Sequence, residues 1–135
     1  MVAALVGATL CQFGCSSGGP PSFVGKWTCK AGAQGSNSSF TFNADGTMSF
    51  VATNGPKQVP YKETGMGTWS ASAKALSVTP VTVQLDCPSK ADRAKLLPYV
   101  NAQVNVKSTS PFVWKGNDEF LLSQSGVQQD FKRSN

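Results

Sequence analysis

Apolar and polar residues alternate along most of the chain from residue 23 onward, and this period of two predicts short strands. The clearest example is FTFNADGTMSF at residues 40–50, where two apolar residues alternate with polar ones on each side of NADG. Within NADG, Asp45 can cap a turn and Gly46 is free to adopt a positive φ. We therefore predict a β-hairpin with one apolar face.

The same alternation predicts strands on both sides of this hairpin. Upstream, a strand opens at residue 25 and places Trp27, Cys29 and Ala31 on one face. Downstream, YKETGMGTWS at residues 61–70 is a strand in which Gly65 and Gly67 indicate a bulge or sharp coil. Pro80 interrupts the next alternation at a bend. Further strands are predicted at residues 76–78, 81–85, 100–107, 111–115, 120–122 and 128–132.

One segment predicts a helix instead of a strand. Ser89 and Asp92 resemble a capping box, so that about two turns over residues 90–97 can form before Pro98 ends them. Such a short helix must dock through Ala94 or the leucines at 96 and 97 to be stable. It either covers one mouth of a barrel or is a surface excursion tied down near Cys87, and we favour the surface excursion.

Together these elements predict an all-β protein of eight to nine short strands. Tight turns join most of them, which favours sequential antiparallel pairing, and closing such a meander into a barrel removes its unpaired edges. With 135 residues and no internal repeat, a single folded domain is expected, and we assign it to residues 23–135.

The motifs at the two ends of this domain resemble a known family. GKW at residues 25–27, FTFNADG at 40–46, GTW at 67–69 and the ending DEFLL…G…FKR over 118–133 resemble the lipocalin-like domains of the calycin superfamily, of the small bacterial secreted or lipoprotein type. The resemblance implies that Trp27 closes the barrel floor beneath a basic residue near the C-terminus, here Arg133, as a cation–π pair.

The first 22 residues are unlike the rest of the chain. Residues 1–14, MVAALVGATLCQFG, are apolar and uncharged and resemble a secretory signal peptide. The usual charged start is missing, so we expect the true start of the signal to lie upstream of this sequence. Cys15 and the Ser/Gly/Pro run at 16–22 resemble a bacterial lipoprotein processing site and tether, although Gln12 departs from that pattern. We expect lipidation at Cys15 and a location at the cell envelope, periplasmic or exterior, with an unlipidated secreted protein as the alternative.

The cysteine count supports export in this interpretation. With Cys11 removed in the signal and Cys15 lipidated, Cys29 and Cys87 remain, and an even remainder in an oxidising compartment predicts one disulfide. A metal site is the weaker alternative, because the chain has no histidine and no C-x-x-C pair.

Composition excludes several function classes. Charged residues are 14% of the chain, and the net charge of +5 comes from scattered single Lys and Arg residues, so that a solvated surface is expected rather than a nucleic-acid site. Without histidine, a nucleophile elbow, a phosphate loop or a carboxylate cluster, neither an enzyme nor a metal or cofactor is expected. Asp118 and Glu119 are interpreted as turn residues.

The aromatic residues are the remaining functional candidates. An eight-stranded barrel can hold one small ligand, and Tyr61, Trp69, Phe112 and Trp114 either line such a cavity or fill the core. We predict a monomeric, non-catalytic binding module of the envelope, for a small apolar ligand or a protein. An inhibitor or immunity-type lipoprotein and a structural envelope protein are the alternatives. An apolar cavity would favour the first class, a packed barrel with a protruding rigid loop the second, and a featureless surface the third.

Overall fold

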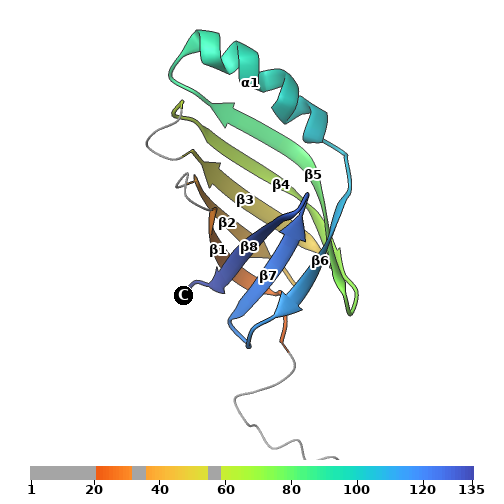
Figure 1. Ribbon diagram of the computed structural model, residues 1–135. Helices are drawn as coiled ribbons and strands as arrows, with labels where there is room; N and C mark the ends of the chain where they lie inside the picture. Colours follow the sequence, from red (N-terminus) through yellow and green to blue (C-terminus); the bar gives the residue numbers. More distant parts are fainter. Residues whose placement is uncertain (1–20, 32–35, 55–58) are drawn as a thin grey trace, which may run out of the picture.

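The chain folds into a closed barrel of eight antiparallel strands with one α-helix, as the computed structural model shows (Figure 1). The structure describes residues 21–31, 36–54 and 59–135. Every strand pairs with its neighbours in sequence, and the first strand closes the barrel on the last. The predicted fold class, an all-β antiparallel meander with one short helix, is thereby confirmed.

Seven connections join the eight strands, and the helix lies in the one between the fifth and the sixth. The elements are β1 (Gly25–Ala31), β2 (Ser36–Phe42), β3 (Thr47–Thr53), β4 (Lys62–Ala71), β5 (Ala75–Asp86), α1 (Lys90–Gln103), β6 (Ser108–Trp114), β7 (Glu119–Gln124) and β8 (Val127–Arg133).

The predicted hairpin at residues 40–50 is formed by β2 and β3, with Phe42 opposite Met48. Both side chains are buried, as the alternation required. In the turn, Gly46 adopts a φ of +84°. The Asp45 carboxylate accepts hydrogen bonds from the Thr47 backbone N–H at 2.9 Å and from its hydroxyl. These bonds favour the ionised form and hold the pKa of Asp45 below its usual value.

Two glycines let β4 pass closely between its neighbours. The ladder between β4 and β5 shifts register between Met66 and Gly67, which confirms the predicted bulge. A Cβ added at Gly67 would overlap the Thr79 carbonyl oxygen and approach the Cα of Pro80 to 2.9 Å. At Gly65 it would collide with the Phe50 ring, which occupies the space above this glycine. The backbone of β4 can therefore lie this close to its neighbours only because these two positions have no side chain.

The helix is longer than the sequence predicted. α1 spans Lys90–Gln103 and includes Pro98, so that the predicted stop at this proline and the predicted strand over residues 100–107 are both wrong. Its start is as expected, since the Ser89 side chain accepts a hydrogen bond from the Asp92 backbone N–H at 3.2 Å.

Solvent exposure explains why Pro98 is tolerated. Proline cannot donate to the carbonyl four residues earlier, which belongs to Ala94. Both residues are exposed, so that water can satisfy this carbonyl. The helix docks instead through Val100, its buried residue, with the leucines at 96 and 97 half-buried. Just beyond its end, the Asn105 N–H donates to the Pro80 carbonyl of β5 at 2.7 Å. The predicted role of Ala94 in docking is therefore wrong.

The expected disulfide is absent, because Cys29 and Cys87 are both free. Cys29 lies in β1, whose neighbours are β2 and β8, whereas Cys87 follows β5, whose neighbours are β4 and β6. The Cys87 thiol is 3.6 Å from the Pro60 carbonyl oxygen, to which it donates. Burial raises the pKa of the Cys29 thiol, so that it stays protonated in the core. The cysteine count thus lends no support to export.

Candidate functional site

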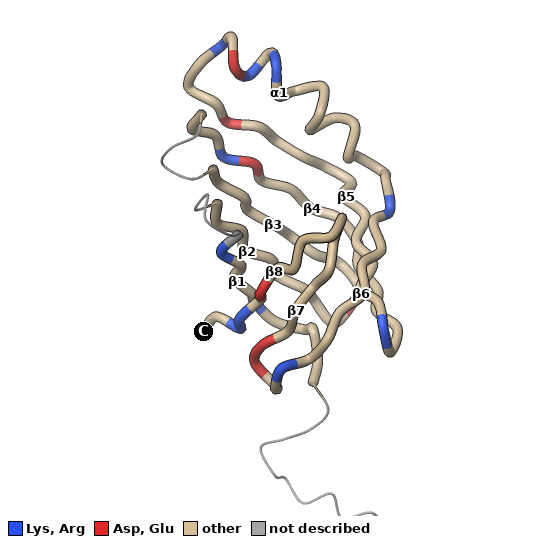
Figure 2. The backbone as a smooth tube through the Cα atoms, viewed as in Figure 1, with Lys and Arg blue, Asp and Glu red and all other residues tan. Residues whose placement is uncertain are grey.

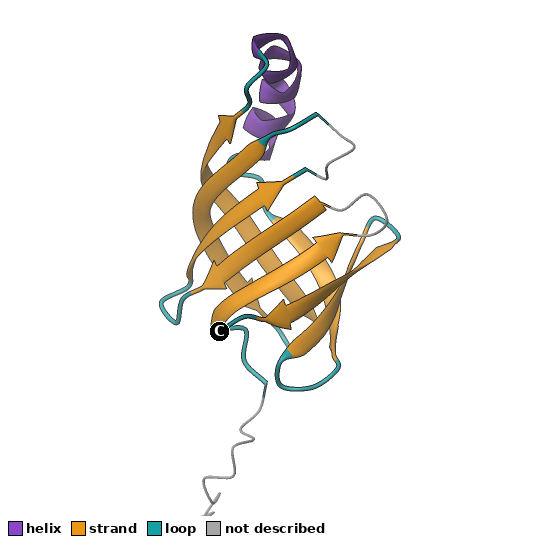
Figure 3. Ribbon diagram, turned by 90° about the vertical axis from the view of Figure 1, so that its left-hand side faces the viewer, coloured by secondary structure: helices purple, strands orange, loops and turns teal. Residues whose placement is uncertain are grey.

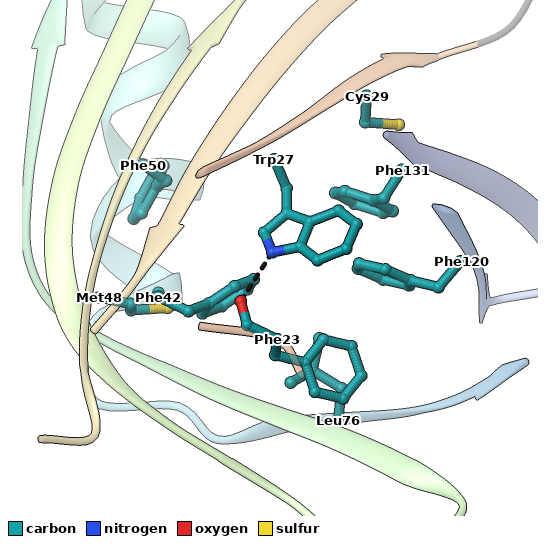
Figure 4. Close-up of a cluster of buried hydrophobic side chains, with 9 residues drawn as sticks. All are labelled: Phe23, Trp27, Cys29, Phe42, Met48, Phe50, Leu76, Phe120 and Phe131. Atoms are coloured by element: carbon teal, nitrogen blue, oxygen red, sulfur yellow. Dashed lines mark hydrogen bonds between the residues drawn. The ribbon is translucent and has the colours of Figure 1, made fainter. Parts of the chain in front are cut away.

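The two ends of the barrel are built differently, and the N-terminal segment closes one of them. Phe23 precedes β1 and is buried. Its ring lies at the centre of an aromatic cluster, part of which is drawn in Figure 4. The ring centroids around it are 4.6 Å away for Trp114, 4.8 Å for Phe112, 5.0 Å for Phe120, 6.2 Å for Trp69 and 6.3 Å for Phe42. We call this cluster, with Trp27, the floor.

Trp27 fixes the position of Phe23 through the backbone. Its indole N–H donates to the Phe23 carbonyl oxygen at 2.6 Å, the dashed line in Figure 4. The indole itself is fully buried and stacks edge-on against Phe120 at 4.9 Å. This bond satisfies a donor and an acceptor that would otherwise be buried without partners.

Arg133 clamps the same segment from the last strand. Its guanidinium carbon lies 4.3 Å from the centroid of the Trp27 ring, which confirms the predicted cation–π pair. The guanidinium also donates to the carbonyl oxygens of Val24 and Ser22, each at 2.8 Å. The Asp118 carboxylate accepts from Arg133 Nε at 2.9 Å and orients the group. In β-sheet register, Trp27 is directly opposite Arg133.

Sequence reasoning missed the central residue of the floor, Phe23, and the residue that orients Arg133, Asp118. Phe23 was placed at the start of the domain without a role, and Asp118 was interpreted as a turn residue. No local pattern distinguishes either one, because each acts through a contact with a distant segment. In contrast, the alternation of apolar and polar residues along the strands was sufficient to place the side chains of Trp27 and the phenylalanines inside the barrel.

The four aromatic residues that were candidates for ligand binding do not form one site. Trp69, Phe112 and Trp114 surround Phe23 in the floor and line a 550 Å³ depression on its outer side. Tyr61 lies just before β4, at the opposite end of the strand from Trp69. Since Phe23 fills the space between the first three, they belong to the packed end of the barrel.

The other end of the barrel contains a cavity, which we call the mouth cavity. It has a volume of about 470 Å³ and an inner continuation of about 80 Å³ that shares four of its residues, Phe40, Val78, Ser108 and Gln124. The remaining walls come from β3, β4, β5, α1 and the loop after it. They are Met48, Phe50, Ala52, Glu63, Pro80, Ala102, Gln103 and Val106.

Glu63 is the charged residue among these lining residues. It is on the inward face of β4, and only 8% of it is exposed. Burial raises the pKa of its carboxyl group above the usual value. Burial and the Glu63 charge together raise the pKa of the Tyr61 hydroxyl, which lies just before β4 at this end of the barrel.

Helix α1 lies beside β5 at the end of the barrel that contains the mouth cavity, as Figures 1 and 3 show. Its last turn contributes Ala102 and Gln103 to the cavity wall. Both of the arrangements considered from the sequence therefore apply in part. The end of the helix borders the mouth, whereas its first turns, with Lys90 and Arg93, are exposed.

Charged residues occur in many elements of the described chain and do not gather in one segment. In Figure 2 the Lys and Arg positions occur on the helix, at both ends of the barrel and along β1. Within residues 21–31, 36–54 and 59–135, no group of three or more Cys, Asp or Glu side chains is placed to hold a metal ion. In the same ranges, no helix has the length and hydropathy needed to cross a membrane.

Comparison with known proteins gives no family assignment: no protein-family model matches the chain, and no curated protein matches its sequence. The class established here is therefore that of the fold, an eight-stranded antiparallel meander barrel with one helix after β5.

Proposed function

We propose that this protein is a non-catalytic binding module that holds a small, mainly apolar ligand in the mouth cavity. The observation that carries the proposal is the cavity itself. Its 470 Å³ lies within the range of small-molecule sites, and its walls combine phenylalanine, methionine and valine with a few polar groups. A barrel closed at one end and hollow at the other supports a ligand-binding role over a purely structural one.

The lipocalin-like relationship is part of this proposal. A GKW strand opening, a tryptophan in the floor and a basic residue over its ring are the features that the resemblance implied, and they support it. The cavity is at the mouth, where barrels of this size admit a ligand. A binding role is favoured over catalysis because, among the described residues, the cavity lining contains one carboxyl group and no histidine, cysteine, lysine or arginine.

We predict that Ala102→Trp abolishes binding of 1-octanol, a small apolar probe. Ala102 is exposed on the last turn of α1 and lines the cavity, so that an indole there occupies the mouth without replacing a barrel residue. Isothermal titration calorimetry with the full-length protein measures the effect. Ala94→Trp is the matched control, since Ala94 is exposed on the same helix and does not line the cavity.

The control variant should bind octanol as the unmodified protein does. If neither the unmodified protein nor the control variant takes up octanol, the mouth cavity is not a site for apolar ligands. Equal binding by both tryptophan variants would place the octanol outside the mouth cavity and contradict the proposal.

We further propose that the protein is held at a bacterial cell envelope by lipid on Cys15, which lies outside the described residues. The motive is the Gly14–Cys15 junction and the Ser/Gly/Pro tether that follows it. Mass spectrometry of the mature protein is expected to show an N-terminus at Cys15 that carries acyl chains. An unmodified mature chain that starts at another residue would contradict lipidation and leave the binding proposal untouched.

A further inference from the structure

A purely apolar ligand would leave the Glu63 carboxylate in the mouth cavity without a counter-charge from residues 21–31, 36–54 and 59–135. Glu63 is 8% exposed, and the lining next to it is dominated by phenylalanine, methionine and valine. Transfer of an ionised carboxylate into such surroundings is costly unless a cation or several hydrogen bonds compensate it. The presence of a carboxyl group at this buried position therefore requires a physical explanation.

The described surroundings of Glu63 supply no cation. Across the ladder, Ala52 of β3 and Leu85 of β5 are opposite Glu63, and both are apolar. The salt bridges of the described chain involve Lys115, in the turn after β6, and Arg133 of β8. The groups of α1, β6 and β7 that line the cavity are uncharged, namely Ala102, Gln103, Ser108 and Gln124.

No described residue donates a hydrogen bond to the Glu63 side chain within the ranges 21–31, 36–54 and 59–135, and burial accounts for its raised pKa. Tyr61 is the titratable group on which the Glu63 charge acts: burial, and then this charge, raise the pKa of its hydroxyl, which keeps it neutral. The carboxylate thus lines a cavity of about 470 Å³ whose other polar lining groups are amides and a hydroxyl.

We propose that the ligand of the mouth cavity is a hydrophobic amine, whose ammonium group pairs with Glu63 while its apolar part fills the cavity. The proposal rests on the function proposed above and adds the chemical class of the ligand. An ammonium group satisfies the carboxylate directly, and charge-assisted hydrogen bonds of this kind are about twice as strong as neutral ones. The apolar walls then contribute affinity, and Glu63 contributes selectivity.

Binding of an amine is coupled to the proton on Glu63. The pKa of the free carboxyl is raised by burial, so that the unliganded protein retains this proton to a higher pH than an exposed glutamate would. The ammonium group favours the ionised carboxylate. Affinity therefore rises with pH as Glu63 ionises, and it falls again only as the amine itself loses its charge, near about 10.4 for an aliphatic ammonium group.

The test compares three probes that share one chain and differ in the head group: octylamine, 1-octanol and octanoate. Calorimetric titration of the full-length protein at pH 7 is expected to show octylamine binding at least about tenfold more tightly than octanol. Octanoate should bind more weakly than octanol, because its charge repels Glu63. Glu63→Gln should reduce octylamine affinity to the level of octanol and leave octanol affinity unchanged.

Asp86→Asn is the matched control. Asp86 ends β5 at the same end of the barrel, is exposed, and is opposite Lys62 in the ladder. The substitution changes the net charge by the same amount as Glu63→Gln, and it should leave octylamine affinity unchanged. Loss of octylamine affinity in both variants would assign the preference to overall charge and overturn the proposal.

The outcomes separate this proposal from the proposed function. If octanol binds and octylamine binds no better, the cavity takes apolar ligands but Glu63 does not select amines. Preference for octanoate would mean that Glu63 acts as a protonated donor, which also overturns the proposal. If none of the three probes binds, the proposed function itself fails.

Thermal unfolding without ligand provides a second readout. The folded protein binds the Glu63 proton more strongly than the unfolded chain does, because the folded-state pKa of this carboxyl group is raised. The free energy of unfolding therefore falls as the pH rises from the pKa in the unfolded chain to the pKa in the folded protein. Glu63→Gln removes the ionisable group and with it this loss of stability. Its melting temperature at pH 7 should equal or exceed that of the unmodified protein. A clear decrease would show that a partner within the chain holds Glu63, and the amine proposal would be overturned.

Discussion

Replacement of Trp27 by alanine is expected to destabilise the barrel by about 3–5 kcal/mol, as is typical when a large buried aromatic side chain is removed. The indole is fully buried, and its removal leaves a void between Phe120 and Trp114. It also leaves the Phe23 carbonyl without its donor and the Arg133 guanidinium without its ring. Urea denaturation measures this effect as a lower midpoint at an unchanged slope.

Two further variants separate the contributions within the floor. Trp27→Phe keeps most of the packing but removes the indole N–H, and it should cost less than Trp27→Ala. Lys132→Met is the control, because Lys132 is exposed on the same strand as Arg133 and its replacement should change stability by less than about 0.5 kcal/mol. A loss below about 1 kcal/mol for Trp27→Ala would contradict the role of this residue in closing the barrel.

Replacement of Gly67 by alanine is expected to cost about 3 kcal/mol, at the upper end of the range for overpacking. The added methyl group would overlap the Thr79 carbonyl oxygen and approach the Cα of Pro80 to 2.9 Å. Both obstacles are backbone atoms of β5, so that no side-chain rotation can relieve the overlap. The β4–β5 ladder must separate locally, which weakens the wall of the barrel at its bulge.

Gly116→Ala is the matched control for this glycine. No atom lies within 4 Å of a Cβ added there, and the backbone does not have a positive φ. The control should therefore be neutral or stabilise the protein by up to about 1 kcal/mol through the unfolded state. Chemical denaturation of both variants measures the difference. Equal stabilities would refute the close approach of β4 and β5 at residue 67.

The sequence was sufficient to predict the features that depend on neighbouring residues or on strand parity. Alternation placed Phe42 and Met48 inside, and NADG specified the turn between them. Paired glycines indicated the bulge at Gly67. The Trp27–Arg133 contact was predicted from a resemblance, and closure of the barrel explains it, since first and last strands must become neighbours.

The errors share a physical cause, which is that tertiary contacts decided the outcome. Alternating valines after Pro98 predicted a strand, but burial of Val100 against β5 and exposure of Ala94 allowed the helix to continue. The cysteine pairing relied on an even count, and count carries no information about which strands are neighbours.

The candidate site was predictable only in part. The alternation in residues 61–70 puts Glu63 on the same face as Trp69. Nothing in the sequence indicated that the barrel would be hollow beside Glu63 and packed around Trp69. That difference follows from Phe23, whose ring fills one end of the barrel. A segment that precedes the first strand determines which end stays open.

The clamp of Arg133 on the segment before β1 has a consequence for the order of folding. Arg133 and Val24 are 109 positions apart, whereas the hairpins are local, so that bringing the two ends together carries the larger loop-closure entropy. We therefore expect the seam between β1 and β8 to form last, and φ-value analysis at Arg133 should give values near zero. Until then β1 and β8 expose unpaired edges, which makes the nearly folded chain the species most prone to aggregate.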